Sequence, residues 1–422
     1  MFIQLDISWL RHPFPVSSFR IAQSEQIQIL QGLGLRNVRC IPFKSDPEVQ
    51  ALLLKMRQPI SHVAESDDTH DAVSAEAALQ ASTAANATDG LDLLQAPESQ
   101  VVKFYDQRFT AAAQQYNQVV HELISEPEKA LQTSSTLVAG YIAEMLNVPQ
   151  TAIRLLSENV GEQQGAHPVN VTILALMLGK AYGLEAKGLT QLGLAALLHD
   201  VGKMDCQPLL WGGMEELPPP QRRNYESHVD ASVRYARRMG LSETSLLAIA
   251  QHHETLDGKG FPCKLQGEAL TVEGQILALT NCYDKLCNPI GNVLPLTPHE
   301  ALSTLFAQRR GAYRKDLVEL FVRVMGVYPP GSIVQLNDDQ YGMVISARSD
   351  IPLKPTVLLY QKDVARESAK TLDLSQFPGK VIKRSLRPSQ LSREILDYLS
   401  PRKRVCYFFQ RAVPLLNPQG DA

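Results

Sequence analysis

The sequence has few cysteines, and they lack the spacings that cysteine-based sites use. There is no Cys-x-x-Cys pair, and the six cysteines are scattered at positions 40, 206, 263, 282, 287 and 406. Scattered cysteines of this kind fit reduced thiols better than a disulfide framework. The expected location is therefore the cytoplasm.

Long apolar runs and a strong net charge are also missing. No run reaches the ~18 residues that a membrane-spanning helix needs, and the opening MFIQLDISWL lacks the charged-then-apolar layout of a signal peptide. The formal net charge is only −3, so no overall basic field points to DNA. There is no Gly-rich loop ending in Lys-Ser/Thr and no Gly-x-Ser-x-Gly elbow. Walker-type nucleotide hydrolysis and serine-hydrolase chemistry are thus disfavoured.

One further absence marks a boundary inside the chain. No Lys or Arg occurs between Arg57 and Lys103, where Ala, Ser, Thr and acidic residues predominate. We expect a flexible acidic linker over residues 59–100. Before it, the strand-like runs FIQLDI and NVRCIPF flank a short helical pattern that ends at glycine. This predicts a small α+β N-terminal domain over residues 1–58.

Helical periodicity dominates the centre of the chain. Apolar residues recur at helical spacing in HPVNVTILALMLGKAYGL, LTQLGLAALLHDVGK, SETSLLAIAQHH and EGQILALTNCYDKLC. Several of these segments are apolar on more than one side, as inside a helical bundle. Later runs alternate around Asn-Asp and Pro turns, and PSQLSREILDYLS predicts a final helix. We predict a mainly α fold, with a helical domain over 101–327 and a β-rich C-terminal extension with a terminal helix over 328–422.

Five histidines and one aspartate of the helical region are candidate metal ligands. They fall within a stretch of about 90 residues, at His167, His199, Asp200, His228, His252 and His253. A single helical histidine is more often an interior or surface residue than a ligand. These residues, however, sit on several helices or helix ends, and a bundle whose facing side chains point inward builds metal sites in this way. Histidine with a carboxylate suits Zn, Fe or Mn, and the carboxylate can bridge two ions.

Two separated motifs resemble one known family. ALLHDVGK holds His199-Asp200-x-Gly202-Lys203, and QHHETLDGKGFP holds His252-His253-Glu254-x-x-Asp257-Gly258-x-Gly260-Phe261-Pro262. Their order and spacing are similar to those of the HD-GYP phosphohydrolases, a branch of the HD superfamily that hydrolyses cyclic di-GMP. The resemblance covers residues 150–327 and implies an HD-type helical bundle. The region before the linker resembles a domain of unknown function that often precedes HD-GYP domains, and the strand-rich tail is similar to an extension seen in some relatives.

The resemblance implies a metal-dependent chemistry. Asp200 would bridge two divalent transition-metal ions, Fe, Mn or similar. The five histidines would divide between these ions, with His167 as the family's first ligand. Two ions ~3.5–4 Å apart lower the pKa of a water between them and neutralise phosphate oxygens. Asp200 and Lys203 would be the catalytic residues, and the Lys203 ammonium would bind the scissile phosphate.

The Gly-Phe-Pro loop has an expected shape and an expected partner. We expect Gly258 and Gly260 to allow positive φ, Pro262 to stiffen the exit, and Phe261 to keep the ring of the family's usual tyrosine. Glu254 and Asp257 are expected to support the loop or the ligands rather than act as an acid/base pair. The resemblance further implies a cyclic dinucleotide substrate and contacts of this loop with a signalling protein, and it leaves a homodimer open.

One departure from the family pattern concerns a metal ligand. The helix after the loop usually carries Asp-x-x-Asp, whose first aspartate is a ligand, whereas LALTNCYDKLC places Asn281 there and Asp284 second. An amide oxygen can coordinate a metal but brings no charge, so the pair of ions would be held more weakly. Asn281 as a hydrogen-bonding residue alone stays open. Gln163 takes the register of a glutamate that some three-metal relatives use, which favours two ions.

A second departure concerns substrate binding. Relatives that hydrolyse the dinucleotide commonly have an Arg-Pro-Tyr-Arg-like stretch shortly after the aspartate, whose cations clamp phosphate. This chain has CNPIGNVLPLTP there, with no cation between Lys285 and Arg309. The clamp is missing unless another arginine, such as Arg309 or Arg310, replaces it.

Three functions fit these residues. The preferred one is a metal-dependent phosphodiesterase that opens cyclic di-GMP to pGpG or GMP in bacterial signalling, because the histidine set is almost complete. Asn281 and the missing arginines favour instead a catalytically weak or inactive module that binds cyclic di-GMP or a signalling partner. A hydrolase for another phosphorylated substrate is the third. The basic runs KVIKRSLRP and SPRKRV suit a phosphate surface or nucleic acid, although such runs are more often solvated faces.

Overall fold

The computed structural model describes most of the chain after residue 97. It covers residues 98–146, 151–157, 160, 165–206, 218–290, 293–309, 311–366, 369–399 and 403–411. It also gives the backbone of three short strands that pair in the order β2-β1-β3, namely β1 (Phe2–Gln4), β2 (Ser18–Arg20) and β3 (Arg39–Cys40). The rest of the predicted N-terminal domain, nearly all of the predicted linker and Gln163 lie outside the described residues.

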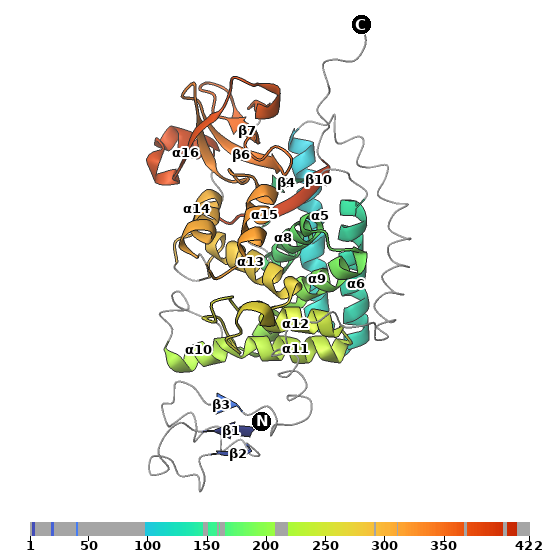
Figure 1. Ribbon diagram of the computed structural model, residues 1–422. Helices are drawn as coiled ribbons and strands as arrows, with labels where there is room; N and C mark the ends of the chain where they lie inside the picture. The colour runs from blue at the N-terminus through green and yellow to red at the C-terminus, as the bar shows by residue number, and fades with distance from the viewer. Residues whose placement is uncertain are drawn as a thin grey trace.

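A bundle of α-helices forms the centre of the molecule (Figure 1). Its helices are α5 (Glu98–Glu122), α6 (Pro127–Leu146), α8 (Ala166–Tyr182), α9 (Ala186–Leu198), α10 (Pro219–Glu226), α11 (His228–Met239), α12 (Glu243–Gln251), α13 (Val272–Cys287), α14 (Pro298–Ser303) and α15 (Lys315–Met325). Helix α8 is buried along most of its length and packs against α9, α13 and α5. This position explains why its sequence is apolar on all sides.

The helix ends bring the two motifs together. Helix α9 ends at Leu198, and the 3₁₀ turn η3 (Val201–Asp205) follows His199 and Asp200. A Cβ on Gly202 would lie 2.2 Å from the carbonyl oxygen of His228. Only glycine therefore lets η3 pack this closely against the start of α11. Helix α12 begins at a Ser242 cap and ends with His252 as its C-terminal cap.

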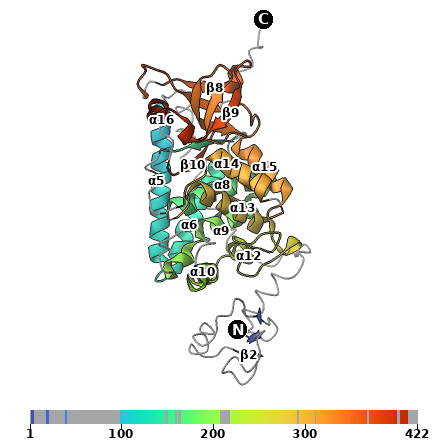
Figure 2. The same ribbon diagram turned by 90° about the vertical axis from the view of Figure 1, so that its left-hand side faces the viewer.

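A seven-stranded antiparallel sheet covers one end of the bundle (Figures 1 and 2). Its order is β10-β4-β6-β5-β9, with β7 beside β6 and β8 beside β7. The strands are β4 (Thr151–Leu155), β5 (Ile333–Leu336), β6 (Tyr341–Arg348), β7 (Thr356–Leu359), β8 (Thr371–Asp373), β9 (Ile382–Leu386) and β10 (Tyr407–Arg411). The sheet thus joins a strand that precedes α8 to strands from the end of the chain.

The mainly α fold with a β-rich C-terminal region is confirmed. The predicted terminal helix forms as α16 (Arg393–Leu399). The sequence patterns missed β4, which lies inside the region expected to be mostly helical, and β10, which follows the terminal helix. The domain boundaries at 58, 100 and 327 stay predictions. Among the described residues, no helix combines the length and apolarity that a bilayer crossing requires.

Candidate metal centre

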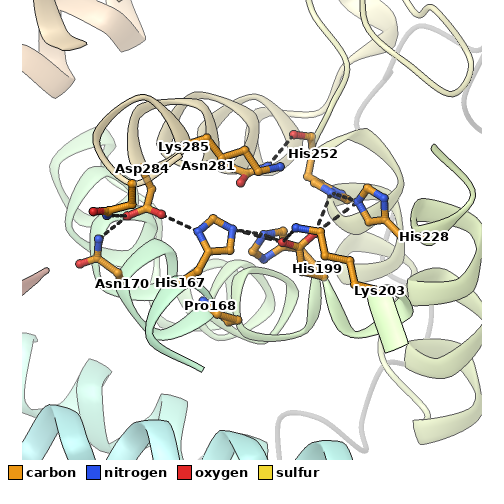
Figure 3. A network of polar contacts seen from close by, with 12 residues as sticks. His167, Pro168, Asn170, His199, Lys203, His228, His252, Asn281, Asp284 and Lys285 are labelled. Carbon is orange, nitrogen blue, oxygen red and sulfur yellow. Dashed lines mark hydrogen bonds and ion pairs between the residues drawn. The ribbon is translucent and has the colours of Figure 1, made fainter. Parts of the chain in front are cut away.

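Four histidines of the predicted cluster, His167, His199, His228 and His252, lie side by side in Figure 3, and the carboxylate of Asp200 lies between them. Its Oδ2 atom is 3.1 Å from Nε2 of His167 and 3.2 Å from Nε2 of His199. Its Oδ1 atom is 3.3 Å from Nε2 of His228 and 3.7 Å from Nε2 of His252. One carboxylate therefore presents each of its two oxygens to a separate pair of imidazoles.

The other ring nitrogen of each of these four histidines is held by an acceptor. The acceptors are the backbone carbonyls of Ala196 for His199 (2.7 Å), Tyr225 for His228 and Ile249 for His252 (2.6 Å), and the carboxylate of Asp284 for His167 (2.5 Å). Each contact engages Nδ1 and leaves Nε2 directed at Asp200. A second contact of this kind is what fixes the tautomer and ring orientation of a metal-binding histidine.

Asp200 is buried together with His199, His228 and His252, and its neighbours favour its ionised form. Burial opposes its ionisation, but His199, Lys203 and Lys285 outweigh that effect and hold the pKa of the Asp200 carboxyl well below its usual range. For His252, burial lowers the pKa well below the ordinary histidine value. A negative carboxylate and a neutral imidazole are the protonation states that metal ligands need.

His253 approaches the cluster from the next position along the chain. It joins Asp200, His228 and His252 in a group whose ligand atoms all lie within 4.8 Å of one another. Its ring stacks on Phe261 with centroids 4.3 Å apart, and its Nε2 lies 3.1 Å from Nζ of Lys285. Burial, followed by the nearby Lys285 cation, lowers the His253 pKa well below its ordinary value.

Asn281 is buried on α13 beside His252. Its Nδ2 donates to the His252 carbonyl oxygen at 3.4 Å. Its Oδ1 has no hydrogen-bond donor among the described residues. An unpaired buried amide oxygen is costly, and its position beside a histidine cluster is consistent with a ligand.

Lys203 reaches back to the central carboxylate. Its Nζ lies 2.5 Å from Asp200 Oδ2 and 5.6 Å from the ring centroid of Tyr225. Lys285 approaches the same tyrosine, with Nζ 3.1 Å from its hydroxyl oxygen. Two ammonium groups therefore stand beside the cluster, and both have partners.

The Gly-Phe-Pro loop supports the cluster from behind. Glu254 accepts hydrogen bonds from the backbone N–H groups of Cys263 (2.6 Å) and Leu265 (3.0 Å), and Asp257 accepts from Thr255 Oγ1 (2.7 Å) within the same turn. Neither carboxylate belongs to the histidine cluster, so their expected supporting role agrees with their contacts.

One expectation for this loop was wrong. Gly258 has positive φ (70°), but Gly260 does not. Gly260 is needed for space instead, because a Cβ there would lie 2.4 Å from the carbonyl oxygen of His253. The Phe261–Pro262 peptide bond is cis, and the Phe261 side chain is buried.

A cavity of about 480 Å³ opens onto the cluster. His167, Asp200 and Lys203 line it from the bundle. Arg309, which was considered as a replacement phosphate-binding arginine, is not among the lining residues and instead contacts Cys282. Arg310 lies outside the described residues.

Several lining residues were not expected from the sequence. They come from α5, from α13 and its end, and from the C-terminal segment, and include Tyr116, His121, Lys285, Asn288 and Arg404. Asp284, named only for its place in a motif, also lines the cavity. Nothing in their sequence spacing links them to the histidine motifs, because tertiary packing alone brings them there.

The donor set fits divalent metal ions. His167 and His199 with Asp200 Oδ2 form one group, and His228 and His252 with Asp200 Oδ1 form another. Lys203 pairs with Asp200 Oδ2, but Asp200 Oδ1 is buried without a hydrogen-bond donor among the described residues, so this oxygen is an unsatisfied acceptor that a metal ion would satisfy. Imidazole and carboxylate suit Zn, Fe or Mn.

Three family models match successive parts of the chain. A family model described as "HD domain" matches residues 119–316, "Domain of unknown function (DUF3391)" matches 1–132, and "KOW domain associated with HD domain" matches 333–394. The predicted resemblance is thus confirmed, and so is the presence of an N-terminal domain of unknown function, although its family model extends to residue 132 and the predicted bound at 58 stays a prediction.

The chain is also similar to named enzymes. A cyclic di-GMP phosphodiesterase of Pseudomonas aeruginosa is 25% identical over 232 residues, which are 54% of this chain and 55% of that protein. The 3'3'-cGAMP-specific phosphodiesterase 2 of Vibrio cholerae is 28% identical over 165 residues, 38% of this chain and 31% of that protein. The chain therefore spans about half, or less, of the length of these relatives.

Among solved structures, an HDG"Y"P protein from Bdellovibrio bacteriovorus matches with a TM-score of 0.35. It is 15% identical, and the match covers 73% of this chain and 82% of that one.

Proposed function

We propose that this chain, whose residues 119–316 form an HD domain, is a metal-dependent phosphodiesterase that hydrolyses cyclic di-GMP to pGpG or GMP. The observation that carries the proposal is the Asp200 carboxylate, which faces one histidine pair with each oxygen. Relatives named as cyclic di-GMP phosphodiesterases support the substrate class. The lowered pKa values of His252 and His253, which favour the neutral imidazole that a metal ion binds, support the metal requirement.

We assign the ligands in two groups around Asp200. His167 and His199 would hold one ion, and His228, His252 and His253 the other. Asn281 is a further candidate ligand, because its buried Oδ1 has no hydrogen-bond donor among the described residues. When bound, two divalent ions would acidify a water molecule and neutralise charge on the phosphate. Lys203, Lys285 and Arg404 line the cavity together with Asp200 and Asp284, so ions bound at the aspartate and histidine cluster would leave these three cations to favour an anion beside the ligands.

The chain's own residues set up the rest of the reaction. Asp284 orients the His167 ring by accepting a hydrogen bond from the Nδ1–H of His167. Lys203, held against Asp200, can turn its ammonium to a phosphate oxygen in the cavity, since lysine is a flexible point charge. Its position suits the neutralisation of charge that develops on the scissile phosphate.

Asn281 supports a second candidate, a weak or inactive module that binds the dinucleotide. An amide brings no negative charge, so one of the two ions would be less firmly held. The Gly-Phe-Pro loop would then serve as the contact for a signalling protein, through exposed residues such as Lys259, whose side chain is 84% exposed.

The two candidates are separated by metal content and turnover. We expect the purified protein to contain Fe, Mn or a similar divalent ion and to linearise cyclic di-GMP, and His199→Ala to lose at least ~100-fold in turnover because one of its ligands is gone. Lys315→Ala, on the exposed surface of α15, is the matched control and should turn over like the parent. A parent that is inactive with Fe, Mn, Ni and Zn but still binds cyclic di-GMP would favour the binding module.

A further inference from the structure

Two asparagines connect the C-terminal segment to Asp284, the carboxylate behind His167. Asn288 at the end of α13 donates to the carbonyl oxygen of Val405 (2.9 Å) and accepts from its N–H (2.7 Å). Asn170 on α8 accepts from the N–H of Tyr407 (2.8 Å). Both asparagines also donate to Oδ1 of Asp284, at 2.5 Å from Asn170 and 2.9 Å from Asn288. Asp284, which orients His167, and the backbone of residues 405–407 are therefore hydrogen-bonded to the same two asparagine side chains.

This attachment places one arginine at the cavity. Arg404 immediately precedes Val405 and lines the cavity together with Lys203 and Lys285. Figure 3 shows Asp284 and Lys203 on opposite sides of His167. Since Val405 is bonded to the asparagines that hold Asp284, Arg404 comes from the Asp284 side of the cavity.

Among the Lys and Arg side chains that line the cavity, Arg404 alone has no partner in the described part of the chain. Lys203 is paired with Asp200, and Lys285 contacts Tyr225 and His253. The Arg404 side chain is exposed, and no ion pair or hydrogen bond to a described residue occupies it. A guanidinium with free donors beside an anion-binding site is well suited to bind phosphate through two parallel hydrogen bonds.

We propose that Arg404 binds the second phosphate of a cyclic dinucleotide while the first occupies the metal centre. It thereby replaces the arginines that are absent between Lys285 and Arg309. The inference rests on the proposed function, because it assumes a substrate with two phosphodiester groups. It gives Arg404, one residue of the basic C-terminal run, a direct role in substrate recognition.

The experiment compares two substrates. For Arg404→Ala, we expect KM for cyclic di-GMP to rise about tenfold with kcat within about twofold, because the lost contact is made equally before and during reaction. Hydrolysis of bis(4-nitrophenyl) phosphate, which has a single phosphodiester, should not change. Arg404→Lys should give an intermediate KM, since lysine keeps the positive charge but cannot form the two parallel hydrogen bonds of a guanidinium group. Arg393→Ala is the control, because that arginine is 93% exposed on α16 and does not line the cavity.

An unchanged KM for cyclic di-GMP in Arg404→Ala, or an equal loss on both substrates, would overturn the role of Arg404. A parent inactive on both substrates would contradict the proposed function instead. In that case, calorimetry with cyclic di-GMP decides the inference. A parent that binds, with about tenfold weaker binding in Arg404→Ala, supports it, while equal affinities or no binding by the parent overturn it.

Discussion

The Asp284 carboxylate lies 2.5 Å from Nδ1 of His167, on the side of the ring that faces away from Asp200. Asp284 is itself 1% exposed and takes hydrogen bonds from two asparagines. Burial, which opposes the protonated form, is outweighed by Asp284 and Asp200, so the His167 pKa is raised. The aspartate therefore fixes the ring and increases its basicity, as expected of a carboxylate behind a metal-binding histidine.

Asp284→Asn tests that arrangement. The asparagine oxygen can still accept from Asn170 and Asn288, but its amide N–H₂ then faces His167 Nδ1 and no longer supports the tautomer with the proton there. We expect metal affinity to fall about 10- to 100-fold, measured by competition with a chromophoric chelator. Asp316→Asn, on the exposed start of α15, is the matched control and should bind metal like the parent. Parent-like affinity in Asp284→Asn would show that the contact does not tune the site.

Asn281→Asp should have opposite effects with and without metal. A carboxylate would add charge to the ligand set, so Mn²⁺ should raise the melting temperature more than in the parent. In EDTA, the variant should melt below the parent, because its second oxygen faces the His252 carbonyl in place of the present N–H donor. Differential scanning fluorimetry with and without Mn²⁺ measures both shifts.

Asn281→Leu separates coordination from hydrogen bonding. It keeps a similar volume but has no oxygen, so it should bind Mn²⁺ more weakly than the parent if Asn281 is a ligand. Equal Mn²⁺ affinity of Asn281→Leu and the parent would exclude Asn281 from the ligand set.

Gly202→Ala should destabilise the whole bundle. The added Cβ would meet the His228 carbonyl oxygen at 2.2 Å and the Ser232 nitrogen at 2.4 Å, which are backbone atoms that cannot rotate away. We expect a loss of about 3 kcal/mol in the free energy of unfolding. The matched control is Gly188→Ala near the start of α9, where the nearest atom is 3.6 Å from the new Cβ and helix propensity predicts a gain of up to about 1 kcal/mol. Equal urea midpoints for the two variants would contradict this packing.

The histidine cluster was predictable largely because four of its six residues lie in two compact motifs, which leaves only His167 and His228 outside them. His199 and Asp200 are adjacent, as are His252 and His253, and each pair ends a strongly apolar helix. Local pattern therefore carries both the residue type and its placement at a helix end. The asparagines behind Asp284 carry no such signal, since Asn170 and the backbone it contacts at Tyr407 are 237 residues apart.

Strands β4 and β10 and the cavity wall were not predicted from the sequence, and the physical reason is the same for all of them. Strand β4 has only five residues, and its partner β10 lies more than 250 residues away, so neither run shows its pairing locally. Arg404 looked like part of a solvated basic run because only its neighbour's contacts with Asn288 bring it to the cavity. The proposed substrate-binding wall of the cavity is thus formed by tertiary packing, whereas much of the candidate metal-binding cluster is set by local sequence.

The hydroxyls of Tyr283 and Tyr407 provide a test of how firmly that tertiary wall is held. They lie 3.0 Å apart in the core, and Tyr407 also donates to the Pro330 carbonyl oxygen at 3.3 Å. Tyr407 then accepts from Tyr283, so Tyr407→Phe leaves two buried polar groups without a partner, whereas Tyr283→Phe removes one donor. We expect losses of about 2–3 kcal/mol and about 1 kcal/mol in the free energy of unfolding, respectively. The double variant, Tyr283→Phe with Tyr407→Phe, no longer contains the unpaired Tyr283 hydroxyl. The double variant should therefore be no less stable than Tyr407→Phe alone. A double-mutant cycle in urea measures this coupling, and strictly additive losses would show that the two hydroxyls do not interact.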